Sequence, residues 1–165
     1  MEFTLRKYQP DDAQAFFALG SDARIKANMR EGFCTSFDAC QALMIDFSAQ
    51  DESRQLCRAI IVDGKLAGSV GIFKQEGAFE KSAEVAYWVG VEYWGNGIAC
   101  RAVEQICQLA FAKWDIVRVF AEPYAHNAPS RRVLEKAGFV LEGTLQKALY
   151  RNGSLYDYCI YALVK

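Results

Sequence analysis

The chain has 165 residues, 24% of them charged, and its formal net charge is −1 at pH 7. A nearly neutral chain lacks the basic footprint of a nucleic-acid-binding protein, and no apolar run approaches the roughly 18–20 residues of a membrane-spanning helix. The opening MEFTLRKYQPDD has no signal-peptide layout. We therefore expect one domain over residues 1–165, a cytoplasmic location, and no nucleic-acid or membrane partner.

The first fifty residues are predicted to form a short strand and three helices. A rough alternation of apolar and polar residues over 3–8 is typical of a strand. Helices are expected at 13–20 and within 21–30, and Ser36 is placed to cap a third helix. This region carries no motif that identifies a substrate.

The period then changes to that of strands. Two apolar runs, 56–62 and 65–73, flank Asp63 and Gly64. This pair tolerates the positive φ that a tight turn requires, so the two runs are predicted to form an antiparallel hairpin. The polar segment 74–81 reads as the loop to the next strand.

The most informative stretch joins a strand to a helix through a glycine turn. The apolar run from Val85 to Val91 precedes Gly95, Asn96 and Gly97. A helix is predicted next, because four apolar residues recur on one face at three- and four-residue spacing. These residues are Ala99, Val103, Ile106 and Ala110. Such an arrangement directs unpaired backbone N–H groups and the positive end of a helix at an anion.

The C-terminal third is predicted to supply a strand, a helix and a second hairpin. The strand is expected at 116–122, the helix at 128–137, and two long strands at 139–149 and 155–164 around Asn152–Gly153. A strand–helix–strand unit demands a parallel pair, whereas hairpins demand antiparallel pairs. The fold class is therefore α/β, with a twisted mixed sheet of about seven strands and helices on both faces.

Two phosphate-binding templates and a metal site are disfavoured. A P-loop needs Gly-Lys-Ser/Thr where this chain has Gly97-Ile98-Ala99, and a dinucleotide fingerprint needs a third glycine where Cys100 stands. The six cysteines include no CxxC pair, and His126 is the only histidine. We therefore expect no metal ion.

The stretch AEVAYWVGVEYWGNGIACRAV resembles the acyl-CoA-binding segment of the GNAT N-acetyltransferases, whose signature is R/Q-x-x-G-x-G/A. The segment from Asn127 to Phe139, NAPSRRVLEKAGF, resembles a second segment of that superfamily. Together with Glu142-Gly143 and the closing DYCIYAL, it is most similar to the RimJ/RimL-like branch, the ribosomal-protein N-terminal acetyltransferases. One departure is Glu92, which stands where the signature has Arg or Gln.

The resemblance implies the GNAT layout, in which two central parallel strands splay apart and acyl-pantetheine enters between them. It makes acetyl-CoA the cosubstrate. The pyrophosphate is expected on the amides of the turn, the pantetheine along the preceding strand edge, and the remaining contacts on the later helix. The cofactor-binding residues are then Trp88, Val89, Gly90, Val91, Trp94, Gly95, Asn96, Gly97, Ile98, Ala99, Asn127 and Arg132.

Two catalytic residues also follow from the resemblance. Glu84 occupies a strand position where several GNAT branches carry a carboxylate, and it would accept the proton of the attacking amine. Ser130 fits the Asn-x-x-Ser pattern and would donate a hydrogen bond to the departing thiolate. Each has a structural alternative: an edge carboxylate paired with a cation for Glu84, and a helix cap for Ser130.

The acceptor is predicted from acidity. An α-amine has a pKa near 7.7–8.0 and a lysine ε-amine near 10.4, so deprotonating lysine at neutral pH costs about 3.4 kcal/mol more. A site without a strong base therefore favours a peptide N-terminus. A polyamine or aminoglycoside acceptor, and a catalytically silent acyl-CoA-binding module, are the alternatives. The long C-terminal strands would also allow a homodimer.

Overall fold

The protein is described by a computed structural model that covers residues 1–30 and 35–165. Seven strands form one sheet in the order β1-β2-β3-β4-β5-β7-β6. The strands are β1 (Thr4–Arg6), β2 (Gln55–Val62), β3 (Lys65–Lys74), β4 (Ser82–Val89), β5 (Arg118–Ala121), β6 (Val140–Arg151) and β7 (Ser154–Val164). The α-helices are α1 (Ala13–Gly20), α2 (Ala23–Lys26), α3 (Phe37–Ala49), α4 (Ile98–Lys113) and α5 (Ala128–Lys136). Three 3₁₀ turns complete the elements: η1 (Pro10–Asp12), η2 (Gly77–Phe79) and η3 (Val91–Tyr93).

Neighbouring strands pair antiparallel except for β4 and β5, which are parallel. The parallel pair follows from the chain order, because α4 carries the chain from the end of β4 back to the start of β5. The predicted mixed seven-stranded sheet is therefore confirmed, and the sheet is not closed into a barrel.

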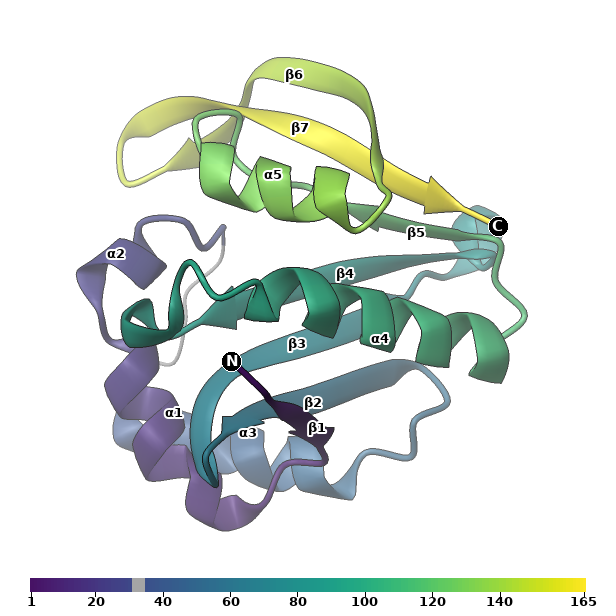
Figure 1. The fold of residues 1–165 in the computed structure, drawn as a ribbon. Coiled ribbons are helices and arrows are strands. Elements are labelled where there is room, and N and C mark those ends of the chain that lie inside the picture. The colour runs from purple at the N-terminus through teal and green to yellow at the C-terminus, as the bar shows by residue number, and fades with distance from the viewer. Residues whose placement is uncertain (31–34) are drawn as a thin grey trace.

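Helices cover both faces of the sheet, as Figure 1 shows. One apolar cluster packs α4 and α5 against the sheet through fully buried residues such as Val103, Ile106 and Leu134. A second cluster packs α1, α2 and α3 against the opposite face through Phe16, Ile25 and Met44. Burial of these side chains is the main stabilising contribution, at about 1.5–3 kcal/mol for each large apolar side chain.

α4 buries the apolar stripe that its spacing predicts. Val103, Ile106 and Ala110 are fully buried, whereas Ala99 in the first turn is half-buried. Because this stripe faces the sheet, α4 lies along the sheet on the same face as α5. No helix in the described part of the chain is long and apolar enough to cross a membrane.

Candidate active site

β4 and β5 separate in the middle of the sheet. Their pairing is confined to three positions, from Ser82 opposite Arg118 to Glu84 opposite Phe120. Beyond these positions β4 continues to Val89, while β5 ends at Ala121. Figure 1 shows the two strands diverging toward the side on which α4 and α5 begin. The sheet therefore opens along one edge of β4, as the predicted splay requires.

The turn after β4 depends on two glycines with positive φ. Gly95 has φ of +78° and Gly97 has φ of +70°, and a Cβ added at either would meet no atom within 4 Å. Conformation rather than space therefore demands glycine at both positions. Between them, the Asn96 side chain donates to the carbonyl oxygens of Tyr93 and Trp94, each at 3.1 Å, and this stiffens the turn.

The amides of this turn point into open space. Within residues 1–30 and 35–165, no acceptor takes a hydrogen bond from the backbone N–H groups of Gly95 through Cys100. The Trp94 N–H differs, because it donates to the Val91 carbonyl at 3.2 Å. Six consecutive free donors at the positive end of a 16-residue helix form a site suited to an anion, which we call the amide cradle (residues 95–100). Most of the turn amides on which the pyrophosphate is expected are therefore available.

The strand edge beside the cradle is partly occupied. The Trp94 indole Nε1 donates to the Val89 carbonyl at 2.8 Å, and the Gly90 N–H donates to Ala67 in β3 at 2.8 Å. Trp88 lies on the other face of the sheet, where its ring packs edge-on against Phe16 with centroids 5.1 Å apart. A ligand that pairs with the Val89 carbonyl therefore shares that oxygen with the half-exposed indole or displaces it.

The start of α5 brings Asn127 and Ser130 to the opening. Asn127 caps the helix, because its side chain accepts from the Ser130 N–H at 3.2 Å. The Ser130 hydroxyl is left for another contact, and its Oγ lies 2.8 Å from the Tyr87 hydroxyl of β4. Burial raises the pKa of Tyr87 well above its usual value, so this phenol stays protonated at neutral pH.

Glu84 lies on the face of the sheet covered by α1–α3. Arg30 forms ion pairs with both Glu84 and Glu122, and all three side chains are partly buried. Glu122 directly follows β5, so one guanidinium joins the two strands where they begin to separate. Ala86, two residues beyond Glu84 on the same face, is exposed although β4 is a central strand. The sheet is therefore uncovered beside Glu84.

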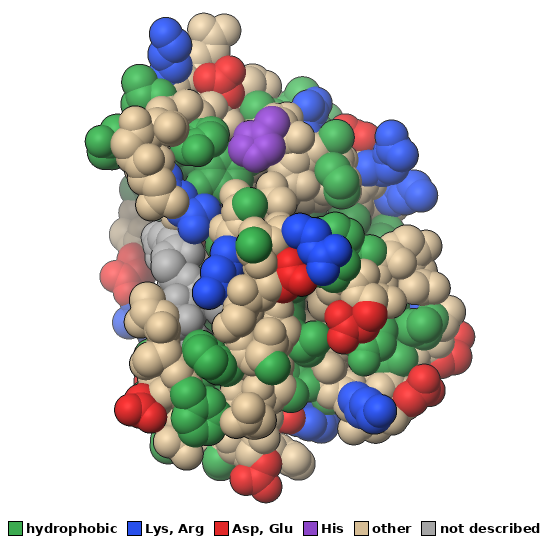
Figure 2. All heavy atoms as spheres, turned by 90° about the vertical axis from the view of Figure 1, so that its left-hand side faces the viewer, with side chains coloured by type: hydrophobic (Ala, Val, Ile, Leu, Met, Phe, Trp, Pro, Cys, Tyr) green, Lys and Arg blue, Asp and Glu red, His purple; other side chains and the backbone are tan. Residues whose placement is uncertain are grey.

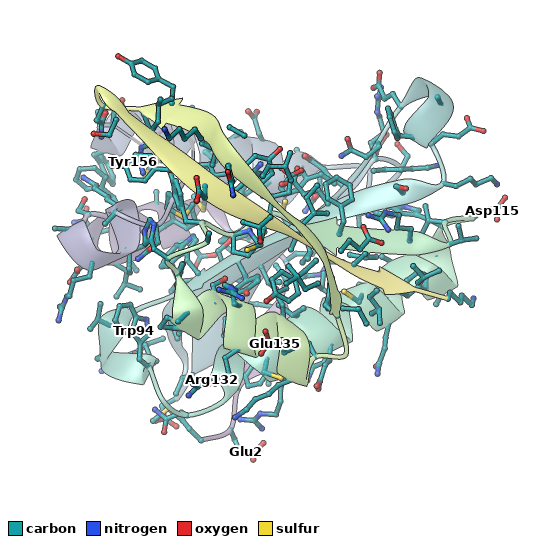
Figure 3. All side chains as sticks on the ribbon, turned by 90° about the horizontal axis from the view of Figure 1, so that it is seen from above. Glu2, Trp94, Asp115, Arg132, Glu135 and Tyr156 are labelled. Carbon is teal, nitrogen blue, oxygen red and sulfur yellow. The ribbon has the colours of Figure 1, made fainter. Side chains whose placement is uncertain are left out.

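Four basic residues of α4 and α5 differ in their contacts: Arg101, Arg131, Arg132 and Lys136. Arg101 contacts the Met1 carbonyl and lies over the Phe3 ring, 5.0 Å from its centroid. Arg131 donates to the Tyr161 hydroxyl at 3.1 Å. Arg132 and Lys136 have no hydrogen bond or ion pair with any described residue. They are therefore free to meet a phosphate. Figure 3 shows Arg132 at the same end of the molecule as Trp94, with Asp115 at the far end.

Figure 2 looks onto the end of the molecule where α4 and α5 begin. The purple side chain is His126, the only histidine, which is exposed beside the start of α5. Its ring stacks on Tyr124 with centroids 5.1 Å apart, so it forms part of an aromatic cluster. Among the described residues, no group of three or more His, Cys, Asp or Glu side chains could hold a metal ion, and Cys34 lies outside them.

Three residues that line the opening are not predicted from the sequence: Tyr87, Arg30 and Glu122. The alternation of β4 places Tyr87 on the same face as Val85, but its partner lies 43 residues later in the chain. Arg30 lies 54 residues before Glu84 and 92 before Glu122. For Tyr87, the sequence signal is a hydroxyl-bearing side chain within the apolar run from Val85 to Val91.

Comparison with known proteins places this chain in a family. The model of the acetyltransferase (GNAT) domain matches residues 2–140. The putative ribosomal N-acetyltransferase YdaF of Bacillus subtilis (strain 168) is 33% identical over 106 residues, which make up 64% of this chain and 57% of YdaF.

Two solved structures are similar to this chain over nearly its whole length. The microcin C7 self-immunity acetyltransferase MccE, in complex with acetyl-CoA and AMP, gives a TM-score of 0.85 at 27% identity, over 99% of this chain and 93% of that one. RimL, a ribosomal L7/L12 alpha-N-protein acetyltransferase in complex with coenzyme A, gives 0.87 at 21% identity, over 98% and 93%. The second likeness is one of fold.

A sheet that opens between two parallel strands, beside an amide cradle, is suited to binding an acyl carrier with a phosphate group. The chain belongs to the GNAT acetyltransferase family. This confirms the predicted class, an acetyl-CoA-dependent N-acetyltransferase, and the resemblance to RimJ/RimL-like enzymes.

Proposed function

We propose that the protein transfers the acetyl group of acetyl-CoA to the α-amine of a peptide or protein N-terminus, by direct attack through a tetrahedral intermediate. The observation that carries the proposal is the row of free N–H groups from Gly95 to Cys100 beside the unpaired edge of β4. This row would hold the pyrophosphate, and the adjoining edge from Trp88 to Val91 would align the pantetheine arm so that the thioester reaches the splay.

Two groups are assigned to the chemistry. Glu84 would accept the proton of the attacking amine from the face covered by α1–α3, and Ser130 would meet the sulfur from the face covered by α5. In this arrangement the amine and acetyl-CoA approach from opposite faces of the sheet. Asn127 would hold the start of α5, and Arg132 would meet an outer phosphate.

The acceptor class follows from the charge around Glu84. Arg30 already occupies this carboxylate, so Glu84 gives limited help to an amine that must lose a proton. An α-amine is partly neutral at physiological pH, whereas a lysine ε-amine is almost wholly charged. The name of YdaF, a putative ribosomal N-acetyltransferase, points the same way. A small-molecule amine is the second candidate, because MccE, named as a self-immunity acetyltransferase, is similar over nearly the whole chain.

The test is acetyl-CoA turnover with a matched acceptor panel. Each peptide would be supplied with a free N-terminus and, separately, with a blocked N-terminus and one internal lysine, and a polyamine and an aminoglycoside would be included. Thiol release with the free N-terminus only, and a mass increase of one acetyl group mapped to that residue, is the expected result. Turnover confined to the polyamine or aminoglycoside would mean that the acceptor is a small-molecule amine. Coenzyme A binding without turnover would indicate a catalytically silent module.

A further inference from the structure

Tyr87 and Ser130 face each other across the gap between β4 and α5. Tyr87 lies three residues beyond the last β4–β5 pair, and Ser130 lies in the first turn of α5. The Tyr87 hydroxyl oxygen is 2.8 Å from Ser130 Oγ and 3.1 Å from the Ser130 carbonyl oxygen. The pair therefore joins the open edge of the sheet to the helix that carries the group assigned to the sulfur.

The number of protons limits how this contact can be arranged. A phenol has one proton to donate, and it has two acceptors here. If Tyr87 donates to Ser130 Oγ, the serine proton is free to point into the gap. If Tyr87 donates to the carbonyl instead, its oxygen accepts the serine proton, which is then not available to a ligand in the gap. The phenol thus determines where the Ser130 hydroxyl is aimed.

The surroundings keep this phenol in place and protonated. The Tyr87 ring is packed against the cluster formed by α4 and the sheet. Loss of hydration raises the pKa of Tyr87 more than the hydrogen bond to Ser130 lowers it. A fixed, neutral donor beside a half-buried serine can orient that serine without being consumed in the reaction.

We propose that Tyr87 is a positioning residue that directs the Ser130 hydroxyl toward the sulfur of the bound thioester. The proposal rests on the proposed function. In the reaction the amine nitrogen forms a bond to the carbonyl carbon, the C–S bond breaks, and its electron pair goes to sulfur. The amine proton leaves to Glu84 or water. Tyr87 and Ser130 keep their protons, because an alcohol and a phenol are weaker acids than a thiol, and they stabilise the thiolate by hydrogen bonding.

The experiment is a double-mutant cycle on steady-state kinetics with acetyl-CoA and an acceptor found in the panel. Tyr87→Phe keeps the ring and removes the hydroxyl. It is expected to lower kcat three- to tenfold, with the KM for acetyl-CoA within twofold of wild type. Ser130→Ala is expected to lower kcat at least tenfold. The double variant should be no slower than Ser130→Ala alone, because the hydroxyl that Tyr87 orients is then absent.

Tyr161→Phe is the matched control. Tyr161 is also a buried phenol that contacts α5, since it accepts from Arg131 and donates to Glu135 at 2.8 Å. The fold-decrease in kcat caused by Tyr161→Phe is expected to multiply with that caused by Ser130→Ala, as for independent sites. As a second variant, Ser130→Thr keeps a hydroxyl, so Tyr87→Phe should still lower kcat in that background.

Two outcomes would overturn the inference while leaving the proposed function intact. One is a wild-type kcat for Tyr87→Phe, and the other is a double variant in which the two losses multiply as they do for the control. Thermal unfolding of each variant verifies that a loss of rate is not a loss of fold. If the wild-type protein released no thiol from acetyl-CoA with any amine of the panel, the proposed function would be refuted, and this inference with it.

Discussion

Gly97 is the residue that sets the direction of the amide cradle. Its φ of +70° immediately before α4 is left-handed backbone, which costs other residues roughly 1–2 kcal/mol. We predict that Gly97→Ala lowers the free energy of unfolding by about 1 kcal/mol and weakens coenzyme A binding at least tenfold. The added methyl group would stand beside the free amides, where the pyrophosphate is expected. Calorimetric titration with coenzyme A measures the affinity.

Gly153 provides the matched control for this prediction. It lies in the β6–β7 turn with φ of +78°, and a Cβ there also meets no atom within 4 Å. Gly153→Ala should cost a similar free energy of unfolding and leave the affinity for coenzyme A unchanged. Equal affinity in both variants would show that the turn before α4 does not hold the phosphates.

Glu84 gives a second prediction for a single residue. Glu84→Gln removes a proton acceptor but keeps the shape of the side chain, so kcat should fall at least tenfold while the KM for acetyl-CoA stays nearly constant. Steady-state kinetics of the wild type and the variant tests this effect.

Glu122→Gln is the control for Glu84, because both carboxylates contact Arg30. If Glu84 is the proton acceptor, the Glu122 variant should lose less kcat than the Glu84 variant. An equal loss in the two variants would mean that the carboxylates act only by placing Arg30, and it would remove Glu84 from the chemistry.

At the scale of elements, β3 and β4 approach each other unusually closely at Gly68. A Cβ on Gly68 would lie 2.4 Å from the Trp88 carbonyl oxygen and 2.9 Å from the Val89 Cα. Both atoms belong to backbone, so β4 must move where it separates from β5. We predict that Gly68→Ala lowers the free energy of unfolding by about 1–3 kcal/mol and also weakens coenzyme A binding.

Gly71, in the same strand, separates this backbone clash from a general effect of alanine. A Cβ there would meet the Phe73 ring at 3.0 Å and the Cys57 sulfur at 3.3 Å, both in side chains that can shift. Gly71→Ala should therefore cost less stability and leave the binding of coenzyme A intact. Chemical denaturation and titration of both variants test the difference, and identical losses would contradict a specific role for the Gly68 approach.

The elements that sequence predicts well are those defined by local chemistry. Asp63–Gly64 and Asn152–Gly153 both adopt the positive φ that their hairpins require. Ser36 caps α3 by accepting from the Ala39 N–H at 3.2 Å. In each case the residues that decide the structure lie within a few positions of one another, so propensity and spacing are enough.

Contacts between distant elements are not encoded in such spacing. Asn127 and Ser130 are both suitable caps for α5, and only the fold shows that Asn127 takes the cap while Ser130 turns to Tyr87. The indole of Trp94 on the Val89 carbonyl also depends on how the glycine turn folds back. These contacts set the geometry of the candidate site, and they arise from packing between elements that are distant in the chain.

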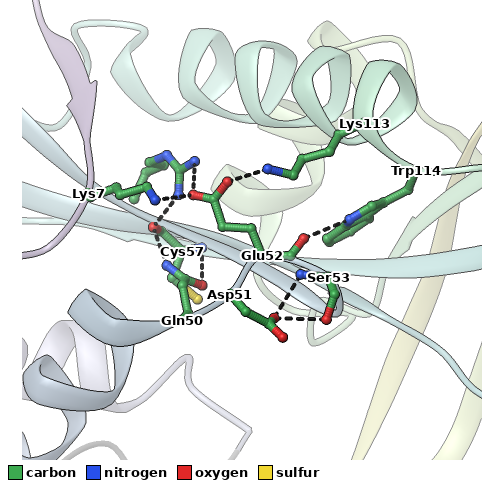
Figure 4. A network of polar contacts seen from close by, with 9 residues as sticks. Lys7, Gln50, Asp51, Glu52, Ser53, Cys57, Lys113 and Trp114 are labelled. Carbon is green, nitrogen blue, oxygen red and sulfur yellow. Dashed lines mark hydrogen bonds and ion pairs between the residues drawn. The ribbon is translucent and has the colours of Figure 1, made fainter.

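At the scale of the whole molecule, an ion cluster around the buried Glu52 carboxylate fixes the end of α4 opposite the amide cradle. Glu52 lies between α3 and β2, and its carboxylate contacts Arg58 at 2.7 Å, Lys113 at 2.5 Å and Lys7 at 3.1 Å. The Trp114 indole donates to the Glu52 carbonyl at 2.9 Å (Figure 4). Residues from the start of the chain, β2 and the end of α4 therefore meet at one carboxylate.

This cluster makes the free energy of unfolding depend on pH. Lys113 is the largest of the three cationic causes that hold the pKa of Glu52 at about 2. Because the folded-state pKa is lowered, the stabilisation is fully present above the unfolded pKa of about 4.5 and is lost as the pH falls toward 2. We predict that Glu52→Gln lowers the free energy of unfolding at pH 7 by about 2–3 kcal/mol, because three cations lose their shared carboxylate.

Asp51 is the neighbouring control, since it is exposed and, among the described residues, hydrogen-bonds to Ser53 alone, at 2.8 and 2.9 Å. Asp51→Asn should leave the stability at pH 7 nearly unchanged, because solvent screens the interaction of this exposed carboxylate with Arg54. Urea denaturation at several pH values compares the variants. The wild type should lose stability between about pH 4.5 and 2 more steeply than Glu52→Gln, so that their difference shrinks with acid. If the difference stayed constant across that range, Glu52 would stabilise the end of α4 by packing rather than by charge.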